Sequence, residues 1–281
     1  MPRVTHTLSL VAALALSASA ADQPSSDGAA AMAAPIAHTY REVEGRRLNA
    51  FVFARAEPSS SPSPAVVLAV GGAWTRGTPQ QLFFLARFFA SQGIVAVPVE
   101  YRLADKSNSP VESYDDLCNA IAFLRRNAKH FAIDPHRIAA WGNSSSGQVV
   151  AVTATVGCGN SEGSLANGGP DALLLVSPVV DAAADGLFRQ LMRGYGDPAS
   201  LSPVHTLRGR IAPTIITQGE ADETTTLARS QVFCTRVITE GGNCELLSLP
   251  GIGHVLDASS RKRSAEEQVR FLRQLWPQAG G

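Results

Sequence analysis

The sequence of 281 residues has few charged side chains and no run of one sign. Lys and Arg number 24, Asp and Glu also number 24, and charged residues make up 17% of the chain. Residues 1–20 contain Arg3 and no acidic residue, so their removal would leave 23 basic against 24 acidic side chains. A net charge near −1 without a basic run offers nothing to a phosphate backbone, and we predict no nucleic-acid partner.

The N-terminus lacks an apolar run long enough to cross a bilayer. The run from Leu8 to Leu16 is roughly half of the ~20 apolar residues that a transmembrane helix needs. It follows a short segment with Arg3 and precedes Ala18-Ser19-Ala20, a small-residue cleavage site. We therefore predict a cleaved signal peptide at residues 1–20, no membrane anchor, and a secreted or periplasmic mature protein.

Cysteine is scarce, and no C-x-x-C spacing indicates a metal site. The four cysteines of an exported chain fit two disulfides, and three pairings are open to them. We favour Cys234–Cys244, which are close in the sequence across a helix-to-strand turn, and this leaves Cys118–Cys158. Buried free thiols are the alternative.

Large apolar residues are rare in two segments, residues 21–36 and 57–64, which are rich in Ala, Ser, Pro and Gly. We expect the first to be a disordered mature N-terminus and the second a loop. The remaining chain has no internal repeat, and 45% of the whole sequence is hydrophobic, which is enough for one sizeable core. We predict a single domain over residues 37–281.

Short β-rich runs alternate with helical stretches along this domain. Such alternation is typical of a mostly parallel sheet covered by helices on both faces. HTYREV and LNAFVFAR flank a turn and predict an antiparallel hairpin, which together with six later strands gives an eight-stranded α/β sheet. The six strands are expected at 65–70, 94–100, 137–142, 172–177, 213–218 and 244–249, and the helices at about 79–92, 111–130, 145–157, 224–240 and 263–275.

A serine-rich turn follows the strand at 137–142. Small residues around a serine between a strand and a helix are typical of a nucleophile elbow, although the strict G-x-S-x-G pattern is broken here. Aligned on Gly142, the nucleophile is Ser144 and Ser146 stands where glycine is expected; aligned on Gly147, the central residue is Ser145. We choose Ser144 because Gly142 directly follows the strand.

A nucleophilic serine needs a base, and the chain has only His205 and His254 after Ser144. His254 follows the last predicted strand on the loop PGIGH, whereas His205 has no strand before it. The imidazole in turn needs a carboxylate to fix its tautomer. Asp222 follows the strand at 213–218 and gives the order Ser, Asp, His; Asp181 is the alternative acid.

Acyl transfer also needs hydrogen-bond donors for the oxyanion, and backbone N–H groups can supply them. VGGAW at residues 70–74 follows a buried strand, and its glycines would allow a close approach to substrate. We expect the N–H groups of Gly72, Ala73 and Ser145 to form the oxyanion hole, and Trp74 to contact the substrate.

Four blocks together resemble the α/β-hydrolase esterases related to hormone-sensitive lipase and to bacterial feruloyl and acetyl-xylan esterases. These blocks are VGGAW, EYRLA, DPHRIAAWGNSSSG, and QGEAD with PGIGH, in order over roughly residues 65–256. The resemblance implies an α/β-hydrolase fold, an ester substrate, an acyl-enzyme mechanism and no cofactor or metal. It also implies that Arg102 and Asp116 support the elbow, and that the short insertion between Val180 and Ala212 forms only a minimal lid over an open site.

Three residues depart from the family pattern: Val70 replaces the His of the oxyanion loop, Ser146 replaces the elbow Gly, and Gln148 replaces a common His. We expect Ser146 to crowd the elbow and slow the enzyme; the alternative is that its hydroxyl helps to hold the turn or the oxyanion through a hydrogen bond. The chain is thus predicted to be an exported serine carboxylesterase for short-chain acyl esters, with acetylated or feruloylated carbohydrate as candidate substrates. An arylformamidase or other amide-directed relative, and an exported binding protein that has lost the chemistry, are the alternatives.

Overall fold

The computed structural model describes residues 34–55, 61–159 and 168–277. The predicted signal peptide lies outside these residues, and so do residues 21–33 of the predicted disordered segment. The described part of that segment ends in a strand, because β1 begins at Ile36. No helix among the described residues is long and apolar enough to cross a membrane.

Six parallel strands form the main sheet, in the order β4-β3-β5-β6-β7-β8. β3, β5, β6 and β7 carry Val, Ile, Leu and Ala that are almost fully buried, as expected of strands covered on both faces. The strands are β3 (Ser63–Ala69), β4 (Val95–Pro98), β5 (Ile133–Asn143), β6 (Ala172–Val176), β7 (Thr214–Gly219) and β8 (Cys244–Leu249).

The predicted eight-stranded sheet is instead two sheets. β1 (Ile36–Val43) and β2 (Arg46–Val52) form a separate antiparallel hairpin, which is joined to the main sheet by the isolated bridges Ala50–Val99 and Phe53–Ala96 rather than by a continuous ladder. The same register would place Pro98 opposite Phe51, and proline has no N–H to donate to the ladder. Pro98 therefore interrupts the pairing with the hairpin, and β4 ends at Pro98, before the predicted boundary.

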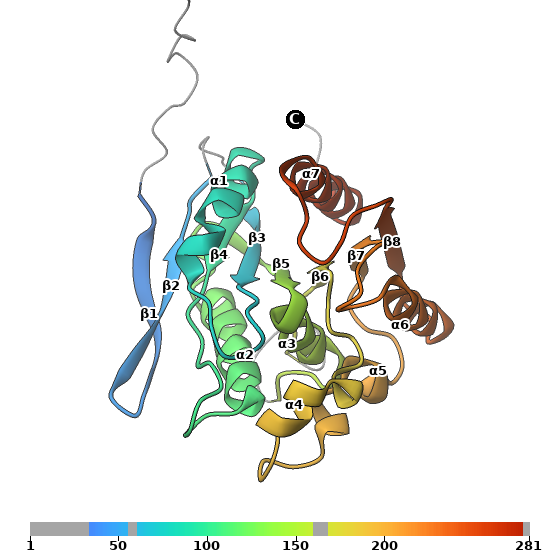
Figure 1. Ribbon diagram of the computed structural model, residues 1–281. Helices are drawn as coiled ribbons and strands as arrows, with labels where there is room; N and C mark the ends of the chain where they lie inside the picture. The colour runs from blue at the N-terminus through green and yellow to red at the C-terminus, as the bar shows by residue number, and fades with distance from the viewer. Residues whose placement is uncertain (1–33, 56–60, 160–167, 278–281) are drawn as a thin grey trace, which may run out of the picture. The chain divides into compact units, whose positions relative to one another are not determined.

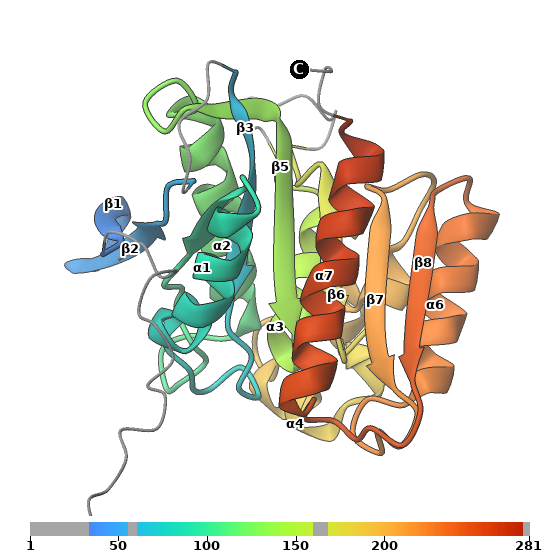
Figure 2. The same cartoon turned by 90° about the horizontal axis from the view of Figure 1, so that it is seen from above.

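Helices cover both faces of the main sheet (Figures 1 and 2). One face carries α1 and α7, and the other carries α2, α3 and α6, so the predicted layered arrangement is confirmed. Their bounds are α1 (Phe83–Ser91, preceded by the 3₁₀ turn η1 at Pro79–Leu82), α2 (Pro110–Arg126), α3 (Ser144–Thr155), α6 (Leu227–Thr239) and α7 (Ala258–Leu275).

The segment between β6 and β7 folds into short helices that the sequence pattern did not predict. They are η2 (Ala182–Ala184), α4 (Gly186–Leu191), η3 (Pro198–Leu201) and α5 (Pro203–Thr206). Figure 2 shows α4 beyond the carboxyl ends of the strands, the edge of the sheet where the predicted site residues also lie. This segment, Ala182 to Thr206, is called the cap below.

Both favoured disulfides are present. Cys118 in α2 is bonded to Cys158 just after α3, and Cys234 in α6 is bonded to Cys244 at the start of β8. The alternative of buried free thiols is therefore wrong for this structure, because it holds no free cysteine.

Candidate active site

Ser144 lies at the sharp turn between β5 and α3. Its φ angle of 51° is in the left-handed region, which non-glycine residues seldom adopt. The turn is tight: a Cβ on Gly142 would lie 2.5 Å from the carbonyl oxygen of Ser146, so only glycine fits there. This geometry presents the Ser144 side chain at the carboxyl edge of the sheet.

The side chains of Ser144, His254 and Asp222 form a continuous hydrogen-bonded chain. His254 Nε2 lies 3.0 Å from Ser144 Oγ, and His254 Nδ1 lies 2.9 Å from Asp222 Oδ2. His254 stands on the loop after β8, and its side chain is one-quarter exposed, whereas the Asp222 carboxylate is fully buried. The structure thus brings together the three residues that the sequence analysis chose.

The Asp222 carboxylate receives five hydrogen bonds. Oδ1 accepts the backbone N–H groups of Thr224 and Thr225, both at 2.8 Å. Oδ2 accepts from Gln218 Nε2 and Thr225 Oγ1, each at 2.8 Å, and pairs with His254. Burial raises the pKa of Asp222, but the hydrogen bonds from Thr225 and His254 outweigh it, so the pKa lies below its ordinary value.

Thr225 and Gln218 are functional candidates that the sequence analysis missed. Thr225 Oγ1 lies 3.2 Å from His254 Nδ1 and 3.0 Å from the carbonyl oxygen of Ser177, so it contacts the imidazole, the carboxylate and the neighbouring strand end. Gln218 is fully buried and is itself held by Ser230. The only available signal was their position around Asp222 in QGEADETTT, which does not reveal side-chain direction.

The oxyanion loop after β3 packs closely against the elbow. The Gly71 N–H donates to Asn143 Oδ1 at 2.8 Å, and a Cβ on Gly71 would lie 2.3 Å from the Asn143 carbonyl oxygen. The Gly72 N–H donates to Ser145 Oγ at 3.0 Å, so this predicted oxyanion donor is already engaged.

The other two predicted donors are available to a ligand. The Ser145 N–H is at the second position of α3, where helix N–H groups have no intrahelical acceptor. Within the part of the chain that the structure describes, the Ala73 N–H has no hydrogen-bond acceptor. Both N–H groups are therefore free of an acceptor within the described residues, as the prediction of oxyanion donors requires.

Trp74 does not lie where we expected it. It was predicted to contact the substrate, but it is 3% exposed and its ring lies 5.1 Å from that of Phe188 in α4. Its indole N–H donates to Gln148 Oε1 at 2.8 Å. The cap helix α4 covers this side chain, because the apolar face of so short a helix must be buried against the body of the protein.

Ser145 and Ser146, the neighbours of Ser144, have other partners. Ser145 is buried and its hydroxyl accepts the N–H of Gly72, which leaves Ser144 as the serine that faces the histidine. The Ser146 hydroxyl accepts the Asn143 N–H at 2.9 Å and lies 2.7 Å from the carbonyl oxygen of Ala69. These hydrogen bonds fit the alternative expectation, in which the hydroxyl helps to hold the turn.

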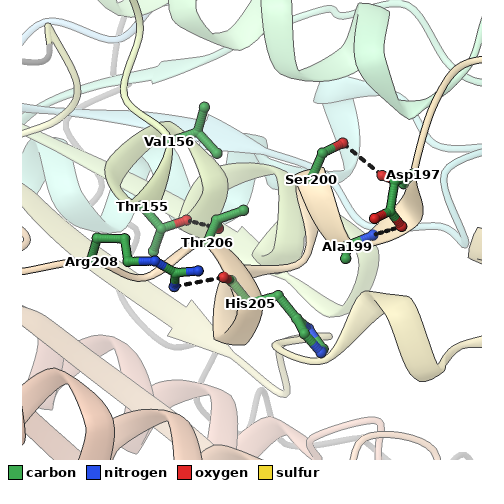
Figure 3. A pocket seen from close by; sticks show the side chains of 8 residues that line it. All are labelled: Thr155, Val156, Asp197, Ala199, Ser200, His205, Thr206 and Arg208. Atoms are coloured by element: carbon green, nitrogen blue, oxygen red, sulfur yellow. Dashed lines mark hydrogen bonds between the residues drawn. The ribbon is translucent and has the colours of Figure 1, made fainter.

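The alternative base and acid form a separate pair away from Ser144. His205 Nδ1 lies 3.7 Å from Asp181 Oδ1 and 3.0 Å from Ser202 Oγ. His205 borders a surface hollow of about 580 Å³ at the far end of α3, which Figure 3 shows. The hollow is lined by Thr155, Val156, Asp197, Ala199, Ser200, His205, Thr206 and Arg208.

Arg102 and Asp116 make a bidentate pair, but they do not touch the elbow. Arg102 Nε and Nη2 donate to the Asp116 carboxylate at 2.8 and 2.9 Å, and this hydrogen bonding raises the pKa of Arg102. Asp116 also accepts a hydrogen bond from Nη1 of Arg41 in β1, at 2.6 Å. The pair therefore fastens the hairpin and the segment after β4 to α2.

The BD-FAE family model matches residues 53–184. The chain is 25% identical over 248 residues to Esterase LipC of Mycobacterium tuberculosis, an alignment that covers 80% of this chain and 61% of that protein. It is 36% identical over 84 residues to an arylesterase of Saccharolobus solfataricus, covering 30% of this chain and 27% of the relative. The chain thus spans less than two thirds of the length of either relative.

Among solved structures, esterase 2 of Thermogutta terrifontis has a closely similar fold. Its native form superposes with a TM-score of 0.79 at 24% identity, covering 89% of this chain and 96% of that one. The same esterase phosphoramylated by tabun gives 0.79 at 26% identity, covering 89% and 98%. The chain therefore has the α/β-hydrolase fold and resembles, in sequence and in structure, esterases of that fold.

Proposed function

We propose that this protein is a serine carboxylesterase that hydrolyses short-chain acyl esters through an acyl-enzyme. The observation that carries the proposal is the hydrogen-bonded chain from Ser144 through His254 to the buried carboxylate of Asp222. The esterases that this chain resembles support the same reaction class, and one of them is phosphoramylated by tabun.

In the first half-reaction, Ser144 Oγ attacks the ester carbonyl while His254 Nε2 accepts its proton. Asp222 holds the imidazole in the required tautomer and stabilises the imidazolium. The N–H groups of Ala73 and Ser145 bind the oxyanion of the tetrahedral intermediate. When the carbon–oxygen bond of the leaving group breaks, His254 gives the proton to the departing alcohol.

The second half-reaction repeats these roles with water. His254 removes a proton from a water molecule, which attacks the acyl carbonyl, and a second tetrahedral intermediate forms. Its collapse breaks the bond to Ser144 Oγ, to which His254 returns the proton, and the carboxylic acid leaves. No step needs a cofactor.

We assign the protein to an exported, oxidising compartment, with a signal peptide at residues 1–20. Two disulfides support this assignment, because such bonds persist in secreted and periplasmic proteins. Acetylated and feruloylated carbohydrates are the substrates that we put forward first.

A fluorophosphonate probe followed by peptide mass spectrometry tests the nucleophile, because only an activated serine reacts. We expect the adduct on Ser144, and no hydrolysis of p-nitrophenyl acetate by Ser144→Ala. Ser145→Ala is the matched control: it loses the bond to Gly72, which costs about 1 kcal/mol of stability, but it keeps the backbone N–H and most of the activity.

An adduct on Ser145 would overturn the assignment of the nucleophile. Absence of any adduct on folded protein would favour the non-catalytic binding protein. A panel of p-nitrophenyl esters, acetylated xylan, methyl ferulate and N-formylkynurenine then ranks the substrate classes, and a preference for the formamide would favour the amide-directed alternative.

A further inference from the structure

The residue after the proposed oxyanion donor Ala73 is strained. Ala73 and Trp74 have φ angles of 52° and 62°, both in the left-handed region. This conformation is unfavourable for a non-glycine residue, and a bulky residue such as Trp rarely adopts it. It persists only where surrounding contacts hold it.

The contacts that hold the Trp74 side chain come from α3 and the cap, while its backbone carbonyl accepts the N–H of Ala104 at 2.8 Å. The indole N–H donates to Gln148 Oε1 at 2.8 Å, and Gln148 Nε2 donates to the Leu201 carbonyl at 2.6 Å. Gln148 is fully buried. An indole N–H can only donate and a carbonyl oxygen can only accept, so these partners use both ends of the amide and fix its orientation.

We propose that Gln148 is a positioning residue for the oxyanion hole. It does not touch the reacting atoms; it holds the Trp74 side chain, and Trp74 in turn keeps the strained turn in which the Ala73 N–H is directed to the substrate. The inference rests on the proposed esterase function.

The physical reason is the position of Gln148 between three parts of the protein. It is on the same helix as Ser144 and Ser145, it binds the oxyanion loop through Trp74, and it binds the cap through Leu201. Without the Gln148 side-chain oxygen, the buried indole N–H would lose its acceptor. A movement of Trp74 that brought this N–H to water or to another acceptor would then be favourable. Relaxation of φ at Ala73 or Trp74 rotates the adjoining peptide planes and displaces the N–H groups.

A second buried pair in the protein supplies a matched control. Trp141 Nε1 donates to Gln268 Oε1 at 3.1 Å between β5 and α7, and Gln268 is also fully buried. Gln148→Met and Gln268→Met each remove one indole–amide bond with little change in side-chain volume. Only the first bond belongs to the oxyanion loop.

We expect Gln148→Met to lower kcat on p-nitrophenyl acetate about tenfold to a hundredfold with little change in KM, short of the roughly 10²- to 10³-fold cost of losing a donor outright. Trp74→Phe, which keeps a ring against Phe188 but cannot donate, should behave alike. Gln148→His should recover most of the loss, because a neutral imidazole offers one acceptor and one donor. Gln268→Met should lower the melting temperature but leave kcat within about twofold.

Equal losses of kcat in Gln148→Met and Gln268→Met, at similar losses of melting temperature, would overturn the proposal. So would a Gln148→His variant no better than Gln148→Met. If Gln148→Met does not fold, Trp74→Phe and Gln148→His carry the same comparison. Failure of the esterase function is seen separately, because the unmodified protein would then neither hydrolyse the ester nor react with the fluorophosphonate.

Discussion

Ser146 has a hydroxyl at the point of the elbow where the G-x-S-x-G pattern has glycine. The side chain is fully buried, accepts the N–H of Asn143 and bonds the carbonyl of Ala69, the last residue of β3. Asn143 in turn accepts the N–H of Gly71 at the start of the oxyanion loop. The hydroxyl therefore links the elbow to the strand from which the oxyanion loop begins.

These contacts predict that Ser146→Gly and Ser146→Ala are slower and less stable than the native enzyme. Each variant leaves a buried N–H and a buried carbonyl without a partner, which costs about 1–3 kcal/mol. Steady-state kinetics on p-nitrophenyl acetate and thermal unfolding measure the two effects. Ser200→Ala, which removes an exposed hydroxyl, is the control. A faster Ser146→Gly enzyme would restore the idea that the side chain crowds the turn.

Asp222→Asn should lower kcat by roughly 10³- to 10⁴-fold, because the amide favours the wrong imidazole tautomer. Circular dichroism checks that the variant is folded. Asp181→Asn is the control, since Asp181 lies beside His205 rather than His254. The reverse ranking of the two variants would transfer the role of the acid to Asp181.

Asp222 also makes stability depend on pH. Its pKa is lower in the folded protein than the ordinary value, so its contribution is fully present above about pH 4 and is lost as pH falls through the folded pKa. The difference in unfolding free energy between native protein and Asp222→Asn should therefore be greatest near neutral pH and shrink in acid. Urea unfolding at a series of pH values measures it; a constant difference would contradict the prediction.

At the residue scale, the sequence predicted the positions of Ser144, Asp222 and His254 because strand ends and chain order locate them. It did not predict the partners of Thr225, Gln218 or Gln148. Those partners depend on which way a side chain points after the chain has folded. Thr225 lies in a loop, which has no periodicity from which to infer that direction. Gln218 and Gln148 lie in β7 and α3, where the sequence pattern does not identify the hydrogen-bond partner of a buried amide. The burial of Trp74 was not predicted either, because the helix that covers it, α4, comes more than a hundred residues later in the chain.

At the element scale, the hairpin β1–β2 is attached to the body by ionic contacts as well as by the two isolated bridges. Asp116 of α2 is fully buried and binds both Arg41 of β1 and Arg102 after β4. Replacing one charged residue of such a cluster removes a partner from the others. The loss of folding free energy therefore depends on how many charges lose a partner.

Asp116→Asn should accordingly lower the free energy of unfolding by at most about 3–5 kcal/mol, because Arg41 and Arg102 then keep only the half-exposed Asp115 as an anion. Arg41→Met should cost less, since Arg102 still pairs with Asp116. The exposed pair of Arg47 and Glu42 is the control, and Arg47→Met should change stability by less than about 1 kcal/mol. Chemical denaturation ranks the three, and an equal effect for Arg47→Met would show that the cluster adds nothing.

Most long elements follow from the sequence, whereas the cap does not. The strands at the centre of the sheet are continuous apolar runs, and α7 has a clear polar and apolar face. The cap helices have three to six residues each, too short for a periodic pattern to be read. Pro98 shows a second limit of sequence analysis. The apolar run around it predicts one long strand, but its missing N–H interrupts the pairing between the hairpin and the sheet.

At the scale of the whole molecule, alternation of strands and helices was enough to predict the fold, because parallel strands need helical crossovers. The edges were harder to predict, since pairing at an edge depends on single residues. Both disulfides lie on the face that carries α2, α3 and α6, and each one fastens a helix to a neighbouring element.

These disulfides predict how the intact protein responds to reduction. The mature protein should show no thiol titratable in denaturant, and reduction should lower its melting temperature, since each bond contributes about 2–4 kcal/mol. Loop-closure entropy makes the bond across 40 residues more stabilising than the bond across 10, by about 1 kcal/mol. Cys118→Ser with Cys158→Ser should therefore unfold more easily than Cys234→Ser with Cys244→Ser. Four free thiols in protein isolated from the exported fraction would contradict the assignment to an oxidising compartment, and the opposite order of stability would show that native packing around α6 and β8 outweighs the entropy of the unfolded chain.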